Sequence, residues 1–165
     1  MYLWTALAEP GVTAMEVGRQ RARRQSGSFS YRNAIVREDS DGIRSRLIGY
    51  RLGDPPDDRN YDDMPPMFVP LQQLEDLAPN TWYVNVLATY PKHRGKGYGR
   101  ELLSIAEQLA KESRSTGPSL IVSDGNSGAR RLYERIGFRE VASRPMVKES
   151  WQNPGRDWVL LLKDL

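Results

Sequence analysis

The sequence predicts an α+β domain in which helices flank a mixed sheet that is mostly antiparallel. Residues 28–52 contain two β-rich segments around a turn, which indicates a hairpin. Residues 81–137 follow the order strand, helix, strand, helix, which indicates a parallel pair of strands. Two further strands are expected at 138–146 and 156–164. The length of 165 residues suits one domain, and we expect 1–165 to form it.

The N-terminal part predicts two helices. Residues 2–8 have the pattern of a short helix, which Pro10 and Gly11 end. Residues 12–25 predict a second helix with a polar outer face, and four arginines lie at 18–25. We interpret this basic stretch as a solvated helix face.

The hairpin follows these helices. Its strands are expected at 28–38 and 45–52, because both are rich in β-forming residues and the DSDG turn signal lies between them. Residues 53–66 are rich in proline and aspartate, so we expect a mobile loop that is too polar to pack. A short helix is expected near 70–77.

The second half of the chain alternates strands and helices. Residues 81–90 have apolar side chains on both faces, which predicts a central strand. Residues 97–113 predict a helix, 119–124 a buried parallel strand, and 126–137 a second helix with Gly137 at its left-handed end. The apolar face expected of the helix at 97–113 consists of Leu102, Ile105, Ala106 and Leu109. The apolar face expected of the helix at 126–137 consists of Ala129, Leu132, Tyr133 and Ile136.

The composition excludes several classes of site. The chain has no cysteine, which excludes a disulfide framework, a thiolate metal site and a cysteine nucleophile. One histidine, His93, cannot form a histidine cluster, and we expect no metal. The net charge of +3 suits an anionic ligand without requiring nucleic acid. There is no run of about 18 apolar residues and the N-terminus lacks a leader pattern, so we expect a cytoplasmic protein without a membrane segment.

The stretch HRGKGYGREL, residues 93–102, joins the central strand to the next helix and alternates glycine with basic residues. It fits neither the Rossmann pattern nor the P-loop pattern. Glycines let backbone N–H groups approach a ligand closely, and the start of a helix favours a phosphate or pyrophosphate. A tight connection without a ligand is the alternative. The glycines are Gly95, Gly97 and Gly99, and the basic residues are Arg94, Lys96 and Arg100.

Two motifs in this order resemble the GNAT superfamily of acetyl-CoA-dependent N-acetyltransferases. The pattern [QR]-x-x-G-x-[GA] is met by Arg94, Gly97 and Gly99. The pattern N-x-x-A-x-x-x-Y-x-x-x-G-[FY] is met by Asn126, Ala129, Tyr133, Gly137 and Phe138. The resemblance covers Gly27 to the C-terminus and implies a GNAT-like acyl-CoA N-acyltransferase fold. The family's first strand is not recognisable in residues 1–25, so it is either missing from this numbering or replaced by another element.

The resemblance implies acetyl-CoA as co-substrate, bound where the central strand separates from its parallel neighbour. The strand's backbone would pair with pantetheine, and the N–H groups of the turn would hold the pyrophosphate. Asn126 would contact the pantetheine arm, although it also suits an ordinary helix N-cap. The expected binding residues are Leu87, Ala88, Thr89, Arg94, Gly95, Lys96, Gly97, Tyr98, Gly99, Arg100 and Asn126.

Tyr133 corresponds to the tyrosine that protonates the departing thiolate, although a core aromatic is the alternative. A strand bulge near Ala88 would supply a backbone N–H to the carbonyl oxygen. The positions where many relatives carry a glutamate base hold Asn85 and Ile121, so the base is open. The candidates are Glu75 and Asp76, by proximity alone, and a water chain. His93 is expected to be a surface residue.

The predicted function is an N-acetyltransferase in which an amine attacks acetyl-CoA directly, without an acyl-enzyme. A GNAT-fold module that binds or senses acyl-CoA without turnover is the alternative, and a nucleic-acid binder is a third, disfavoured hypothesis. The acceptor is expected to be a small amine or a terminal amino group, and a homodimer is compatible with this fold. Residues expected near the acceptor are Tyr2, Trp4, Asn85 and Trp151.

Overall fold

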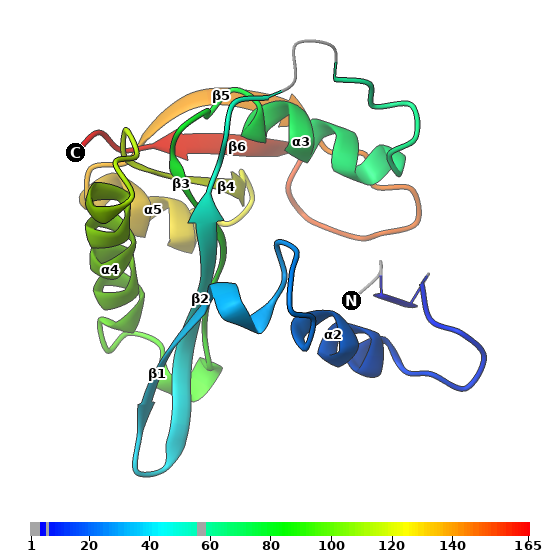
Figure 1. The fold of residues 1–165 in the computed structure, drawn as a ribbon, viewed down its shortest axis with the longest axis horizontal. Coiled ribbons are helices and arrows are strands. Elements are labelled where there is room, and N and C mark those ends of the chain that lie inside the picture. The colour runs from blue at the N-terminus through cyan, green and yellow to red at the C-terminus, as the bar shows by residue number, and fades with distance from the viewer. Residues whose placement is uncertain (1–3, 6, 56–58) are drawn as a thin grey trace.

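A six-stranded mixed sheet forms the centre of the protein, in the order β1-β2-β3-β4-β6-β5 (Figure 1). The computed structural model describes residues 4, 5, 7–55 and 59–165. All neighbouring strands are antiparallel except β3 and β4, which are parallel. The strands are β1 (Ala34–Asp39), β2 (Gly42–Arg51), β3 (Trp82–Thr89), β4 (Pro118–Ser123), β5 (Arg139–Pro145) and β6 (Asp157–Leu162).

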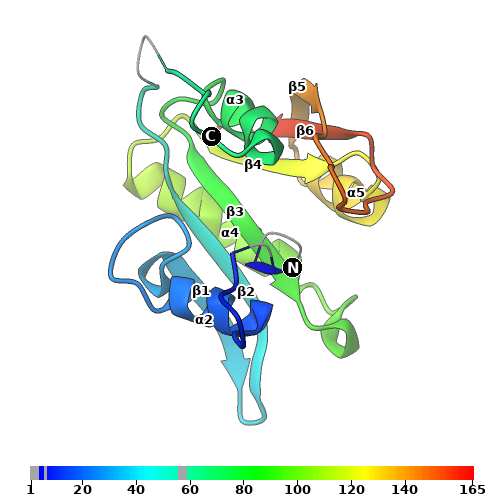
Figure 2. The same cartoon turned by 90° about the vertical axis from the view of Figure 1, so that its right-hand side faces the viewer.

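Helices cover both faces of this sheet. Helices α4 and α5 lie on one face, and α2 and α3 lie on the other (Figures 1 and 2). No helix in the described parts of the chain is long and apolar enough to span a membrane. The helices are α2 (Ala14–Ala22), α3 (Val69–Glu75), α4 (Tyr98–Glu112) and α5 (Ser127–Arg135), and the short 3₁₀ turns are η1 (Tyr31–Asn33), η2 (Pro66–Phe68) and η3 (Pro91–His93).

The core is divided between the two faces of the sheet. The larger cluster lies under α4 and α5 and contains Leu47, Val84 and Leu103. A smaller cluster lies under α3, where Leu74 packs with Leu160. The two clusters follow from the alternation of side chains along each strand, and they make the two faces distinct chemical environments.

The predicted hairpin, central strand, parallel strand and two final strands are all confirmed. The first strand begins later than predicted, because residues 31–33 form a 3₁₀ turn that the Ser30 side chain caps. Gly137 has a φ of +99° after α5, which confirms the left-handed helix end. The short helix predicted at 2–8 includes residues 2, 3 and 6, which lie outside the described residues.

The predicted apolar stripe of α4 is only partly correct. Leu102 and Ala106 are buried as expected, whereas Ile105 and Leu109 are only partly buried. Leu103 and Ala110 are buried instead. The helix is therefore rotated about its axis relative to the prediction, and small side chains face the sheet and allow close packing.

The prediction that the loop at 53–66 is too polar to pack is wrong for its described later part. The Tyr61 hydroxyl donates to the Asp76 carboxylate at 2.8 Å, and Arg59 forms an ion pair with the same group at 2.9 Å. Residues 56–58 lie outside the described residues. A polar partner at the C-cap of α3, Asp76, attaches this segment to the domain.

Candidate active site

The parallel strands β3 and β4 separate after a short paired stretch. They pair only from Trp82–Pro118 to Val84–Leu120. Beyond this point the backbone of residues 87–89 pairs with β2 on one side, and its other edge is not paired with β4. A strand with one unpaired edge can accept an extended ligand as an additional strand. We call this opening the fork.

A β-bulge lies at the start of the fork. Val86 is opposite Ile48 and Val84 is opposite Gly49, so Asn85 has no partner residue on β2. The prediction of a bulge near Ala88 was therefore wrong by three residues. The bulge lies beside Gly49, where an added Cβ would clash with the Trp82 ring, so the large ring and the missing side chain set the local geometry.

The glycine turn has the conformation that its sequence predicted. Gly95 and Gly97 have φ values of +77° and +84°, and Gly97 is the N-cap of α4 without a side-chain cap. The first N–H groups of a helix have no intrahelical acceptor. A Cβ at Gly95 or Gly97 would have nothing within 4 Å. The turn therefore leaves both free donors and open space at the start of α4.

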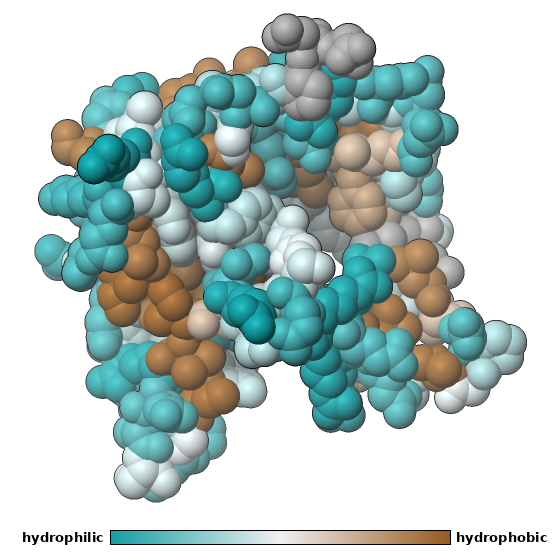
Figure 3. Space-filling view, in the orientation of Figure 1, coloured by the Kyte–Doolittle hydropathy of each residue, from teal (hydrophilic) through white to brown (hydrophobic). Residues whose placement is uncertain are grey.

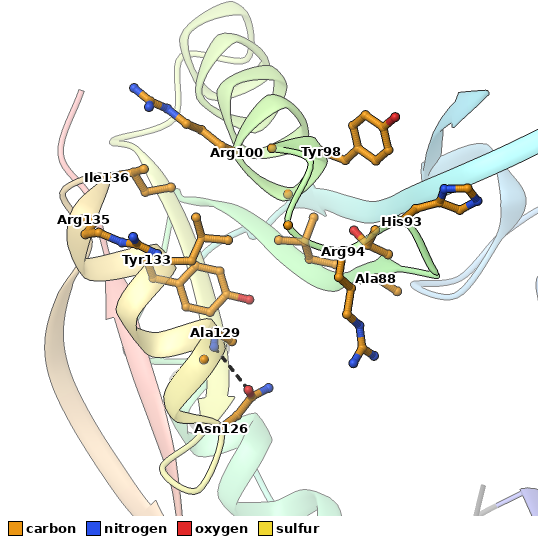
Figure 4. A pocket seen from close by; sticks show the side chains of 17 residues that line it. Ala88, His93, Arg94, Tyr98, Arg100, Asn126, Ala129, Tyr133, Arg135 and Ile136 are labelled. Carbon is orange, nitrogen blue, oxygen red and sulfur yellow. Dashed lines mark hydrogen bonds between the residues drawn. The ribbon is translucent and has the colours of Figure 1, made fainter. Parts of the chain in front are cut away.

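The turn, the fork and α5 enclose one cavity of about 910 Å³ (Figure 4). Lys96 is the one residue of the expected acetyl-CoA set that does not line it. The charges of Arg94, Lys96 and Arg100 are all exposed to solvent. The expected residues that line the cavity are Leu87, Ala88, Thr89, Arg94, Gly95, Gly97, Tyr98, Gly99, Arg100, Asn126 and Tyr133, and His93, Gly128, Ala129, Leu132, Arg135 and Ile136 line it as well.

Tyr133 is a core aromatic that also lines the cavity. Its side chain is 7% exposed and belongs to the core, with its ring centroid 5.9 Å from that of Phe138. Its hydroxyl points into the cavity (Figure 4). Burial raises the pKa of Tyr133 to about 12, because the phenolate would lose solvation. The hydroxyl is therefore protonated at neutral pH and available as a donor.

Asn126 is the N-cap of α5, and its Oδ1 accepts from the Ala129 N–H at 3.2 Å (Figure 4). The capping interpretation is confirmed. Asn126 also lines the cavity, so capping fixes an amide side chain at the edge of the fork.

The expectation that His93 is a surface residue is wrong. The residue is 9% exposed, and its ring turns away from the cavity (Figure 4). Its Nε2 lies 3.0 Å from Nη1 of Arg44, which is itself buried and bound by Asp39 and Asp41. Because arginine only donates, Nε2 accepts and the proton of the neutral ring is on Nδ1. Burial, and then the Arg44 charge, lower the pKa of His93.

A second arginine of the hairpin contacts the start of α4. Arg37 lies 4.4 Å from the centre of the Tyr98 ring and forms an ion pair with Glu101 at 2.9 Å. Arg37 therefore holds the first turn of α4, as Arg44 holds η3. The sequence did not indicate either contact, since both join segments far apart in the chain.

Of the residues expected near the acceptor, Trp4, Asn85 and Trp151 do not line the 910 Å³ cavity. Trp4 packs against Gly18 and forms an edge contact with Phe29 at 5.6 Å. Trp151 stacks on Trp158 at 5.9 Å. Asn85 is exposed at the bulge and donates to the Tyr50 hydroxyl at 3.2 Å. Figure 3 shows a hollow in the surface between the α2 region and the region of α3 and the β5–β6 loop. Tyr2 lies outside the described residues.

On the face of the sheet that α2 and α3 cover, Glu75 has a raised pKa. Burial raises the pKa of its carboxyl to about 7, the Tyr83 hydroxyl opposes that rise by hydrogen bonding, and the charge of Asp76 adds to it. The sequence offered Glu75 only as a neighbour of the central strand. Its contact with Tyr83 needs α3 to fold over the sheet.

The comparisons with known proteins agree with this geometry. The sequence model of the family described as "Acetyltransferase (GNAT) family" matches residues 11–138. "Uncharacterized N-acetyltransferase YycN" of Bacillus subtilis (strain 168) is 41% identical over 51 residues, which are 31% of this chain and 33% of that protein. The match thus spans about a third of the length of this curated relative.

Solved structures share the fold. Naa20 of Chaetomium thermophilum, in complex with a bisubstrate analogue, has a TM-score of 0.62 at 18% identity over 95% of this chain and 77% of that chain. A Bacillus anthracis str. Ames acetyltransferase in complex with acetyl coenzyme A has a TM-score of 0.57 at 17% identity over 80% of this chain and 61% of that chain. The family match covers most of the chain, including the fork and the glycine turn, and the chain therefore belongs to the GNAT acetyltransferase family.

Proposed function

We propose that this protein is an N-acetyltransferase that transfers the acetyl group of acetyl-CoA to an amine in a ternary complex. The observation that carries this proposal is that three features face the same cavity. These are the unpaired edge of Leu87–Thr89, the free N–H groups after Gly97, and the protonated hydroxyl of Tyr133.

The cavity fits the chemistry of acetyl-CoA. The start of α4 offers backbone donors and open space for a pyrophosphate, where a side chain at Gly97 would intrude. The edge of β3 offers N–H and C=O groups to the amide groups of pantetheine. A volume of about 910 Å³ suits a large ligand.

The residues of the chain support direct attack. The sequence has no cysteine, and no serine lies in the glycine turn, so neither supplies a nucleophile for an acyl-enzyme there. Binding both substrates together removes much of the entropic barrier. The bulge at Asn85 leaves backbone donors near the point where the strands separate, and Tyr133 donates a proton to the leaving thiolate.

An assay of free coenzyme A, released from acetyl-CoA, over primary amines and peptides with free N-termini tests the proposal. Release that depends on the amine, with a matching acetylated product by mass spectrometry, is the expected result. Tight binding of acetyl-CoA without turnover on the whole panel would instead favour the binding or sensing module.

The acceptor class, the cellular location and the assembly are further parts of the proposal. We expect a small amine or terminal amino group, a cytoplasmic enzyme, and no binding to nucleic acid. A homodimer is compatible with the fold. Cell fractionation, binding assays with DNA and RNA at several salt concentrations, and light scattering check these expectations.

A further inference from the structure

A half-buried carboxylate, that of Glu75, lies on the face of the sheet that α2 and α3 cover. Glu75 ends α3. Within the described residues, no lysine or arginine forms an ion pair with it, whereas the adjacent Asp76 pairs with Arg59 and accepts from Tyr61 and Gln72. Burying a carboxylate without a cation destabilises the fold, so such a group needs another explanation.

The surroundings of Glu75 connect it to the fork. Leu74, the preceding residue, packs in the cluster that includes Ile121 of β4, and the Tyr83 hydroxyl of β3 donates to the Glu75 carboxylate. Helix α3 thus places Glu75 over the two strands that separate. Tyr133 lies in the core cluster of the opposite face.

Tyr50 continues the path from Glu75 to the bulge. Its ring meets that of Tyr83 edge-on at 5.7 Å, and its hydroxyl accepts from Asn85 at 3.2 Å. Asn85 marks the point where β3 and β4 separate. Polar side chains therefore run along one face from the mouth of the fork to the carboxylate. The titratable and charged groups that act on Glu75 are Asp76 at the C-cap of α3, Tyr83 and Tyr50 from the sheet, and Arg59 from the loop before α3.

We propose that Glu75 is the general base of the transfer reaction and that Asn85 and Tyr50 orient the acceptor at the mouth of the fork. This inference rests on the proposed function. It assigns the acceptor to the primary ammonium class, because a carboxylate beside two aromatic rings favours a cation over a neutral or anionic group.

The protons balance as follows. Glu75 removes one proton from the ammonium group, and the neutral amine forms the C–N bond to the acetyl carbon while the C–S bond breaks. Tyr133 gives its proton to the thiolate sulfur. The second proton leaves the new amide nitrogen and restores Tyr133 through solvent, and Glu75 releases the first proton to solvent. The net products are the acetylated amine, coenzyme A and one proton.

The pH dependence of kcat/KM tests this assignment with the best acceptor from the amine and peptide panel. A base is active when deprotonated, so in the parent enzyme kcat/KM rises with pH through a value near 7. In Glu75→Gln this rise disappears and kcat/KM at pH 8 falls by about 10²-fold or more. Glu112→Gln, on the exposed end of α4, is the matched control and keeps both the rate and the rise.

Two further variants should shift the rise of kcat/KM with pH in opposite directions. Tyr83→Phe removes a hydrogen bond that favours the Glu75 carboxylate, so the rise moves to higher pH. Asp76→Asn removes a nearby negative charge, so the rise moves to lower pH. A purely structural Glu75 predicts neither shift. Circular dichroism and coenzyme A affinity establish that each variant is folded.

The outcomes separate this inference from the proposed function. A parent enzyme without turnover at any pH contradicts the proposed function and, with it, the base. An active parent whose rise in kcat/KM persists unchanged in folded Glu75→Gln contradicts only the assignment of Glu75. Loss of the rise in Glu75→Gln together with opposite shifts in the other two variants supports it.

Discussion

On the face covered by α4 and α5, nearly all of the residues expected around acetyl-CoA line one cavity and come from two short stretches of the chain, 87–100 and 126–136. On the face covered by α2 and α3, the residues near the fork come from distant elements, with Tyr50 on β2, Glu75 on α3 and Asn85 on β3. The first face is thus defined by local motifs. The second depends on how separate segments pack, and the sequence indicated its residues less well.

The largest expected effect concerns the cofactor face. Gly97→Glu and Gly99→Glu should each weaken coenzyme A binding by roughly 100-fold, or about 2.7 kcal/mol. Gly97 needs a left-handed backbone beside open space, and a Cβ at Gly99 would lie 3.2 Å from the Leu132 side chain. Calorimetric titration with coenzyme A measures the loss.

Gly27→Glu is the matched control for Gly97→Glu, because Gly27 has a φ of +92° and open space but does not line the cavity. It should bind coenzyme A like the parent. If both variants of the turn also bind as tightly as the parent, the cofactor site lies elsewhere and the contrast between the two faces fails.

Tyr133→Phe tests the chemical step on the same face. The substitution keeps the buried ring and removes only the hydroxyl, so folding and coenzyme A affinity should barely change. We expect kcat to fall by at least about tenfold, since general-acid catalysis typically contributes more than this. Stopped-flow measurement under conditions where chemistry limits the rate checks the value. Full kcat would leave Tyr133 with a packing role only, and Tyr90→Phe, at an exposed tyrosine, is the control.

A smaller, pH-dependent effect is expected at the contact between His93 and Arg44. The folded protein favours the neutral ring, so its contribution to stability is complete above the unfolded pKa of about 6.5 and is lost as pH falls below it. Protonation would also bring a second cation against Arg44 behind the glycine turn. Coenzyme A affinity should therefore fall several-fold from pH 7 to pH 5, beyond the change in the ligand's own charge.

His93→Gln sharpens this prediction. Glutamine retains an acceptor for Arg44 and does not titrate, so affinity at pH 7 should be retained and this pH dependence should flatten. An unchanged pH profile in His93→Gln would show that another group controls binding.

The smallest effects are expected on the acceptor face. Trp151→Ala should raise the acceptor KM by a few-fold, because a tryptophan face can hold a cationic amine. Trp4→Ala should mainly lower the melting temperature, since Trp4 packs on Gly18 and Phe29. Steady-state kinetics and thermal melts separate the two effects. An unchanged KM in Trp151→Ala removes the reason to include that residue in the acceptor site.

Local signals account for most of what could be predicted. The hairpin, the central strand, the glycine turn and the N-cap at Asn126 each depend on residues that are close in sequence. The errors fall where distant segments meet. The bulge lies at Asn85 because of Gly49 and Trp82, His93 is buried because of Arg44, and the loop at 59–64 is attached because of Asp76.

Local sequence patterns suffice to predict the α+β order of elements, the left-handed glycines before α4, and the tyrosine on the inner stripe of α5, since periodicity and backbone preference act over a few residues. Contacts between distant elements decide that β3 and β4 separate after Val84, that the Tyr133 hydroxyl reaches a cavity while its ring stays in the core, and that the Glu75 carboxylate accepts from Tyr83. Solvation and charge at these positions depend on neighbours from other elements, and packing alone brings those neighbours together.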